Sequence, residues 1–146
     1  MGITCGDFLA GLISQLLKSR KKALGIFLVW TTLAIALYFL LGGISVTMFY
    51  GVIIFGGLAT GYWSVFMSTV AESFGTNIRA TATTTAPNFV RGSTILISFV
   101  LSLVTMCFHD KIMSTIITGG IFLAIAFWAL YHLHDPFGED LDYTEK

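Results

Sequence analysis

The sequence contains few charged residues and few residues that interrupt helices. Lys, Arg, Asp and Glu together make up 11% of its 146 residues, with only 2 Pro and 2 Cys, whereas 55% of the residues are hydrophobic. A soluble domain usually carries about 25% charged residues on its surface. The shortage of charge therefore excludes an ordinary water-soluble domain, and the mean hydropathy of +0.84 indicates that the apolar runs face lipid.

The sequence also lacks the clusters of polar side chains that carry enzyme or metal chemistry. Cys5 and Cys107 have no second Cys or His at ligand spacing, so no metal site is predicted. No Ser/His/Asp set, carboxylate pair or phosphate-binding loop is recognisable, so we expect no catalytic residues, no cofactor and no enzyme activity. Because the net charge is 0, nothing favours nucleic acid as a partner.

Five apolar segments account for most of the chain. A membrane-spanning helix needs about 20 residues at a rise of about 1.5 Å per residue. The sequence predicts an all-α membrane protein with four full transmembrane helices and a shorter, truncated N-terminal one. The short helix covers residues 1–17, the full helices cover 23–41, 46–71, 81–108 and 112–133, and a tail covers 134–146.

The distribution of basic residues predicts the orientation. If the spans alternate, Lys111 stands alone on one side and all the other basic residues outside the spans share the opposite side. These are Lys18, Arg20, Lys21, Lys22, Arg79 and Lys146. Cytoplasmic loops carry the excess of Lys and Arg, so we predict a multi-pass protein of the plasma (inner) membrane with a cytoplasmic C-terminus.

The segment 46–71 carries a stripe of small residues that predicts close helix packing. The stripe consists of Gly57, Gly61, Ser64 and Ser68. Small side chains at this spacing let a neighbouring backbone approach closely. Beside the stripe, Tyr62 and Trp63 could stack on a ligand ring or belong to a packed interface, and packing is the favoured interpretation.

The segment 81–108 has a polar face, which we call the polar stripe. It consists of Thr81, Thr84, Asn88, Arg91, Ser98, Ser102 and Thr105, with Ile95 as the one apolar residue at this spacing. Lipid cannot satisfy these groups, so we expect the polar stripe to face protein or a water-filled cavity.

Arg91 is the residue that is most costly to place in a membrane, at roughly 2.5–3.5 kcal/mol if it is unpaired. One interpretation is a cation that binds or gates a solute, with Asn88 beside it; the other is an Arg that reaches the interface or locks two helices together. Asp7 is the acidic residue at membrane depth, so it is the candidate partner of Arg91 and a candidate pathway residue. Glu72 and Arg79 flank a short loop and can pair across it.

Two stretches resemble signatures of the major facilitator superfamily of transporters. Residues 11–22, GLISQLLKSRKK, resemble the Gly-x-x-x-Asp-Arg-x-Gly-Arg-Arg signature, with Gln15 in the place of Asp and Lys18 in the place of Gly. Residues 71–80, AESFGTNIRA, resemble the Ala-Glu-x-Phe-Pro-Thr-x-x-Arg-Gly/Ala run that follows the fourth helix of a half. The resemblance assigns a cytoplasmic-loop motif to Gly11, Gln15, Arg20, Lys21, Glu72 and Arg79.

The stretch 135–142 is a looser match to the Pro-Glu-Thr-Lys-Gly tail of sugar porters within that superfamily. The order of the three stretches implies that the chain corresponds to helices eight to twelve of a twelve-helix transporter, part of its C-terminal half. The function implied is alternating-access transport of a small organic solute, with the lipid bilayer and the missing N-terminal helices of the same transporter as partners. Such a fragment is not expected to transport alone.

The alternative is a complete small membrane protein that acts as a dimeric multidrug-type antiporter or as a membrane scaffold. Small antiporters need a membrane carboxylate, for which Asp7 is the candidate. Many of them also insert in both orientations, which requires balanced loop charges, whereas the basic residues here favour a single orientation.

Overall fold

The computed structural model describes residues 2–41, 43 and 45–138, and its regular structure within these ranges is entirely helical. The helices are α1 (Gly2–Leu17), α2 (Arg20–Leu41), α3 (Val46–Ala59), α4 (Trp63–Glu72), α5 (Arg79–Phe108) and α6 (Lys111–His132). Four segments are long and apolar enough to cross a membrane: α2, the segment Val46–Glu72, α5 and α6. The prediction of an all-helical chain with four such segments and a shorter first helix is confirmed.

The prediction of one continuous helix over 46–71 is wrong, because the chain leaves the helix at residues 60–62 between α3 and α4. No proline causes this interruption. It lies where the chain crosses α1, and a Cβ atom added to Gly61 would lie 2.5 Å from the Cα atom of Gly6. The stripe is a packing face, as predicted, and the structure shows that its neighbour is α1, since Gly57 contacts Gly2 and Ser64 bonds to Asp7.

The start of α2 precedes the predicted boundary by three residues because two groups outside the helix satisfy its first N–H groups. The Ser19 hydroxyl accepts a hydrogen bond from the backbone N–H of Lys22 at 3.1 Å. An Asp135 carboxylate oxygen accepts one from the N–H of Arg20 at 3.0 Å. Capping of this kind extends a helix into a run of basic residues that would otherwise leave its N-terminal end unsatisfied.

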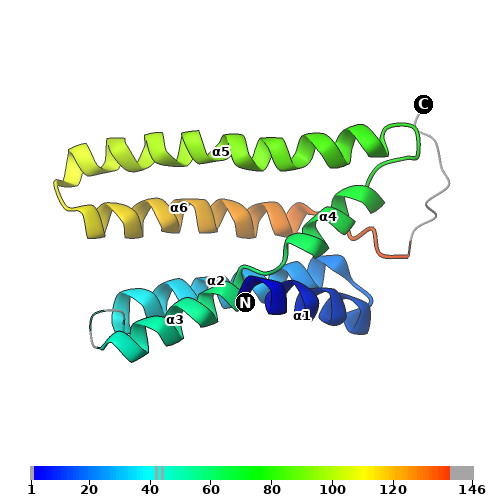
Figure 1. Cartoon of the computed structure of the whole chain (residues 1–146). Coiled ribbons are helices and arrows are strands. Elements are labelled where there is room, and N and C mark those ends of the chain that lie inside the picture. Colours follow the sequence, from blue (N-terminus) through cyan, green and yellow to red (C-terminus); the bar gives the residue numbers. More distant parts are fainter. Residues whose placement is uncertain (1, 42, 44, 139–146) are drawn as a thin grey trace.

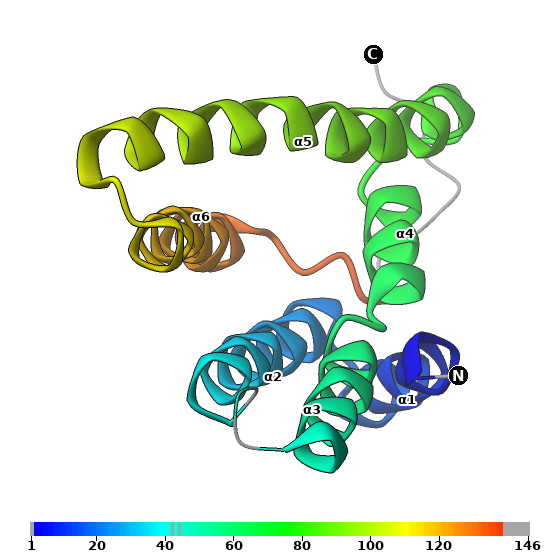
Figure 2. The same cartoon turned by 60° about the vertical axis from the view of Figure 1, so that its left-hand side comes forward.

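The helices form two groups that α4 connects. Helices α1, α2 and α3 pack together, whereas α5 and α6 contact each other. The two helices run one above the other in Figure 1, and Figure 2 shows α6 nearly end-on below α5, so they cross at an angle. Among the described helices, α5 contacts only α4 and α6, while α2 contacts α1, α3, α4 and α6. One long side of α5 is therefore left without a neighbouring helix in the described part of the chain.

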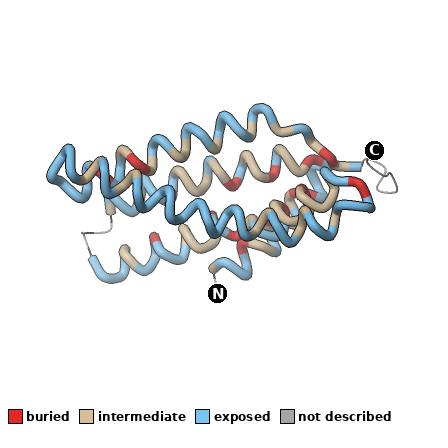
Figure 3. The backbone as a smooth tube through the Cα atoms, turned by 90° about the horizontal axis from the view of Figure 1, so that it is seen from above, coloured by how far each residue is buried: buried red, intermediate tan, exposed pale blue. Residues whose placement is uncertain are grey.

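Burial is concentrated where α1, α2 and α4 meet. The buried cluster there consists of Ala10, Ala23, Phe27 and Val65. By contrast, α5 has no buried residue, and the tube drawing shows it in exposed and intermediate colours along its length (Figure 3). The prediction that the polar stripe faces protein or a water-filled cavity is met in part: Ser98, Ser102 and Thr105 line a cavity at the α5–α6 corner. The rest of the stripe, from Thr81 to Arg91, is exposed and no described helix covers it.

Candidate functional site

Arg20 and Glu72 form an ion pair between the start of α2 and the end of α4. One guanidinium nitrogen, Nη2, lies 2.6 Å from Oε1 of Glu72, and Nε lies 3.0 Å from Oε2. The two side chains are only 15% and 18% exposed. This two-pronged geometry matches the planar fork of Arg to the carboxylate and is stronger and more directional than a single contact.

Two further groups hold the same guanidinium. Nη1 of Arg20 donates to the hydroxyl of Ser14 at 2.9 Å, and the Ser14 residue is fully buried in α1. The guanidinium carbon lies 5.2 Å from the centre of the Phe137 ring, a distance at which the cation is attracted to the ring face. Arg20 thereby connects α1, α4 and the segment that follows α6.

Asp135 binds the loop between α1 and α2. Its carboxylate accepts hydrogen bonds from the Ser19 hydroxyl and from the backbone N–H groups of Arg20 at 3.0 Å and Phe137 at 3.3 Å. Partial burial by itself would raise the pKa of Asp135, but these hydrogen bonds outweigh it and leave the pKa below its ordinary value. The carboxylate is therefore held in its charged form.

We call the set Ser14, Ser19, Arg20, Glu72, Asp135 and Phe137 the Arg20 cluster. It brings together residues from three stretches that are far apart in the sequence, 11–22, 71–80 and 135–142. Residues 139–142 of the last stretch, like the rest of the predicted tail to 146, lie outside the described residues. The three segments therefore meet at the same end of the helix bundle.

The other predicted loop residues take different positions. Lys21 donates to the backbone carbonyl of Tyr131 at 2.7 Å, which ties α2 to α6. Arg79 donates from Nε to the carbonyl of Phe74 at 3.2 Å. The structure pairs Glu72 with Arg20, so the expected pairing of Glu72 with Arg79 is replaced.

Gly11 and Gln15 lie outside the cluster of contacts around Arg20. A Cβ atom at Gly11 would meet nothing within 4 Å, and Gln15 is exposed. Ser14, one residue before Gln15, supplies the contact to Arg20. Sequence reasoning overlooked Ser14 and Ser19 as site residues, although small polar residues flanking a basic run at a helix junction are a usable signal for capping and ion-pair support.

The predicted pathway residues near the helix interruption separate into two environments. Tyr62 is half-buried, and its ring centre lies 6.3 Å from that of Phe27 in the core. Trp63 is 41% exposed and packs on Phe66. Asp7 accepts a hydrogen bond from the backbone N–H of Ser64 at 3.0 Å, in place of the expected contact with Arg91.

Arg91 and Asn88 lie on the uncovered part of α5. Both are exposed, and Asn88 donates to the carbonyl of Thr84 at 3.0 Å. Within the described ranges, the side chain of Arg91 forms no hydrogen bond and no ion pair. The structure thus does not bring Arg91 together with Asp7, Tyr62 or Trp63.

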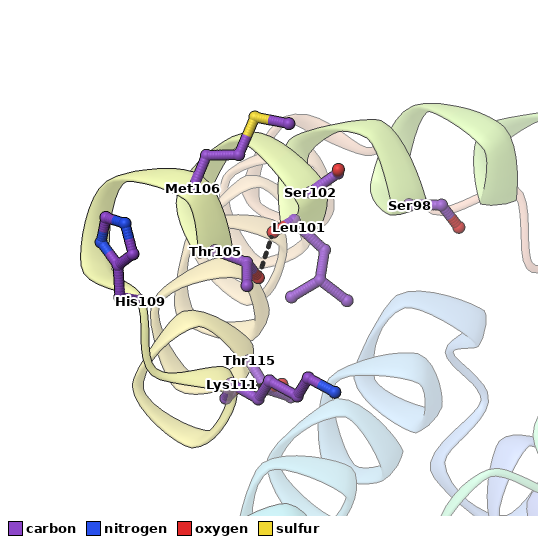
Figure 4. Close-up of a pocket in the computed structure, with 8 residues that line it drawn as sticks. All are labelled: Ser98, Leu101, Ser102, Thr105, Met106, His109, Lys111 and Thr115. Carbon is purple, nitrogen blue, oxygen red and sulfur yellow. Dashed lines mark hydrogen bonds between the residues drawn. The ribbon is translucent and has the colours of Figure 1, made fainter.

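Two cavities border the α5–α6 pair. One, of about 810 Å³, lies at the α5–α6 corner. Its lining is mainly apolar by area, through residues such as Leu101 and Met106, and polar groups come from Ser98, Ser102, Thr105, His109, Lys111 and Thr115 (Figure 4). The other, of about 880 Å³, lies between α2, α3 and α6 and is lined mainly by aliphatic and aromatic side chains.

Comparison with protein-family models, with curated proteins and with solved structures finds no match to this chain.

Proposed function

We propose that the chain is part of a secondary active transporter of the major facilitator type that moves a small organic solute across the plasma (inner) membrane by alternating access. It supplies helices of the C-terminal half and works together with the other helices of the same transporter. The basic loops and the tail lie on the cytoplasmic side, and no chemical step is catalysed.

The Arg20 cluster is the observation that carries this proposal. The three stretches resemble three separate signatures of the family, and in the structure they meet at Arg20, which pairs with Glu72 and donates its backbone N–H to Asp135. A network that ties a loop, a helix end and a tail at one end of the bundle suits a half that moves as a unit, because alternating access rocks one half against the other.

The uncovered side of α5 supports the proposal that further helices pack against this chain. This helix has no buried residue and places Arg91 on the polar stripe, where contact with lipid is unfavourable. The apolar cavity between α2, α3 and α6 gives additional room for apolar side chains of a neighbouring helix. Both features suit the chain as one part of a larger bundle.

Counterflow transport tests the proposal. The tagged chain would be purified from its native membrane with any helices that accompany it, reconstituted in vesicles, and supplied with labelled sugars, organic acids and lipophilic drugs. We expect saturable uptake of one class that is accelerated by unlabelled solute on the opposite side. Uptake that is not accelerated for any solute would contradict alternating access.

The mass of the same preparation distinguishes the alternative function. A purified unit that contains additional helices agrees with the transporter proposal. A homodimer that contains nothing else, and that exchanges cationic drugs for protons, would favour the small antiporter instead.

A further inference from the structure

We propose that the apolar cavity between α2, α3 and α6 binds one acyl chain of an anionic phospholipid, whose phosphate group lies near Lys111 at the start of α6. We call this cavity the apolar groove. Its lining comes from the stretches 31–40 of α2, 52–60 of α3 and 115–123 of α6. The inference goes beyond transport and does not depend on it, because it concerns how the chain contacts its membrane.

The apolar groove is a wedge that is closed at one end. Near the start of α2, the Lys21 ammonium group donates to the backbone carbonyl of Tyr131 at 2.7 Å, and a Cβ atom at Gly25 would lie 3.4 Å from the side chain of Leu130. From this contact, α2 and α6 diverge toward the end of α2 and the start of α6 (Figure 1). The groove therefore occupies only one half of the two helices, between their closed end and their open end.

This shape fits a lipid chain better than a further spanning helix. The lining extends over about 12–14 Å of each helix, at about 1.5 Å per residue, and one leaflet accounts for about 15 Å of the hydrocarbon core. A helix about 10–12 Å thick would need roughly 1,000 Å³ or more over that length, whereas the groove has about 880 Å³. A neighbouring helix can cover the groove with its side chains, but only a thinner chain from one leaflet can lie inside it.

The lining offers almost no polar group to a solute. Four Thr residues contribute, and the hydroxyl of each donates to a backbone carbonyl within its own helix or one turn before it. These bonds join Thr31 to Phe27, Thr32 to Leu28 and Thr115 to Lys111 at 2.8 Å, and Thr60 to Gly56 at 3.1 Å. An acyl chain needs no hydrogen bonds, and it restores the dispersion contacts that an empty groove lacks.

Lys111 lies at the open end of the groove. A smaller cavity lined by Lys111, Gly43 and Ile112 shares Tyr38, Phe39 and Thr115 with the groove. The side chain of Lys111 extends from α6 toward the light-blue ribbon of α2 in the close-up view (Figure 4). As the first residue of α6, Lys111 lies at the end of a span, where lipid headgroups are found. A lipid whose chain fills the groove thus has its phosphate close to this ammonium group.

The charges at the open end favour an anionic headgroup. Lys111 forms no ion pair and donates no side-chain hydrogen bond within the described ranges. Asp110 is the one acidic residue described in 31–60 and 109–123, and its carboxylate already accepts a hydrogen bond from the backbone N–H of Ile112 at 2.8 Å as the cap of α6. An ammonium group without a carboxylate partner attracts a lipid phosphate.

Native mass spectrometry tests the site. The full chain, with any helices that accompany it, would be purified in detergent and stripped of lipid. It would then be titrated with dioleoyl phosphatidylglycerol, which is anionic, or with dioleoyl phosphatidylcholine, which has the same acyl chains and no net charge. We expect one phosphatidylglycerol per chain to bind about fivefold more tightly, the usual effect of one Lys on an anionic lipid. Equal affinities would overturn the proposal.

A leucine at Gly119 should fill the groove without a clash. Gly119 lines the groove, and a Cβ atom there would meet nothing within 4 Å. Leu also favours a helix more than Gly does, so Gly119→Leu should fold. Gly51→Leu is the matched control, because Gly51 is equally open but lies outside the lining. We expect Gly119→Leu to weaken binding of both lipids about tenfold or more, as overpacking does, and Gly51→Leu to leave it unchanged. Equal binding by the two variants would contradict the proposed site.

Variants of Lys111 test the headgroup contact and serve also if Gly119→Leu does not fold. Lys111→Gln should abolish the preference for phosphatidylglycerol, and Lys111→Arg should keep it. The control Lys22→Gln removes an exposed cation near the closed end and should have no effect. A preference that survives Lys111→Gln would overturn the proposal.

Two other occupants have distinct outcomes in the same experiment. Palmitate that binds while phosphatidylglycerol does not would overturn the assignment to a phospholipid. An accompanying helix that is lost in Gly119→Leu, with lipid binding unchanged, would show that protein occupies the groove. Lipid bound at the groove in a preparation without accelerated uptake would support the lipid site and contradict only the transport proposal.

Discussion

The carboxylate of Asp7 accepts a hydrogen bond from the backbone N–H of Ser64 at 3.0 Å, and the Ser64 hydroxyl donates to the backbone carbonyl of Asp7 at 3.2 Å. This pair joins α1 to the first turn of α4, immediately after the interruption at residues 60–62. The residue that precedes α4, Tyr62, provides no side-chain cap. Asp7 thus acts as a capping group supplied by a different helix, and its negative charge suits the positive end of the α4 dipole.

Replacing Asp7 separates the capping function from the charge. We expect Asp7→Ala to lower the free energy of unfolding by about 1 kcal/mol, the usual cost of a lost helix cap. Asp7→Asn keeps an oxygen that can accept from Ser64 and should cost clearly less. Unfolding in mixed detergent measures both, and equal losses would show that the charge, and not the acceptor, is what stabilises α4.

The contact between Gly61 and Gly6 should not accept a methyl group. A Cβ atom at Gly61 would lie 2.5 Å from backbone atoms of Gly6, so Gly61→Ala forces α1 away from the interruption. We expect a loss of about 1–3 kcal/mol, as for other overpacked sites. Gly51→Ala is the matched control, because a Cβ atom there meets nothing within 4 Å. If both variants are equally stable, the close approach is not a constraint on the fold.

The fork of Arg20 should matter more than its charge. Arg20→Lys keeps the positive charge but cannot bond to both oxygens of Glu72 and to Ser14 at once. We expect a loss of about 1.5–3 kcal/mol, typical of hydrogen bonds to charged groups. In the control Lys22→Arg, an exposed basic side chain that forms no ion pair within the described residues is exchanged, so the change should be smaller. A larger loss in the control would contradict the central position of Arg20.

The contribution of Asp135 to stability should disappear in acid. Because its pKa is lower in the folded chain than in the unfolded one, the unfolded chain binds more protons, and stability falls as the pH falls through the two pKa values. The loss should begin below about pH 4, near the ordinary pKa of Asp. Thermal unfolding measured at a series of pH values should show a smaller loss of stability below about pH 4 for Asp135→Asn than for the unaltered chain. An equal loss in both would assign the loss to other carboxylates.

The orientation can be tested with single cysteines at opposite ends of α2. Lys18 and Gly43 are both exposed, so a cysteine at either position should disturb little; Cys5 and Cys107 would first be replaced by Ser. In intact cells we expect a membrane-impermeant maleimide to label Gly43→Cys and to leave Lys18→Cys unlabelled until the membrane is opened. The reverse pattern would invert the proposed topology.

The sequence was sufficient to predict the helices because each spans a long apolar run between polar junctions. It was not sufficient to predict the interruption at residues 60–62, because Gly56, Gly57 and Gly61 weaken a helix without ending it, and the contact that accompanies the interruption is with α1. Hydropathy along one segment does not report a backbone contact with another segment. The contact of Asp7 could not be predicted for a related reason. Its partner is the backbone N–H group of Ser64, and a backbone N–H group leaves no signal in the sequence because nearly any residue can provide one.

The site was predicted in part. Arg20 and Glu72 were identified by resemblance, and the charge of each made a role plausible. The contacts of Ser14, Ser19 and Asp135 around Arg20 were not predicted. Short polar side chains acquire such contacts only when helices from distant parts of the chain meet. Arg91 was conspicuous for the opposite reason, since a charge within an apolar helix is unusual whatever surrounds it.

The Arg20 cluster also orders the events of biosynthesis. Asp135 lies 115 residues after Arg20 and is synthesised only after all six helices of the described chain. Until then the first N–H groups of α2 lack one acceptor, and Arg20 lacks the Phe137 ring. The first helix junction therefore reaches its final form only when the segment after α6 returns to it, so a chain that stalls before this point leaves a polar, incompletely bonded junction that quality-control proteases can reach.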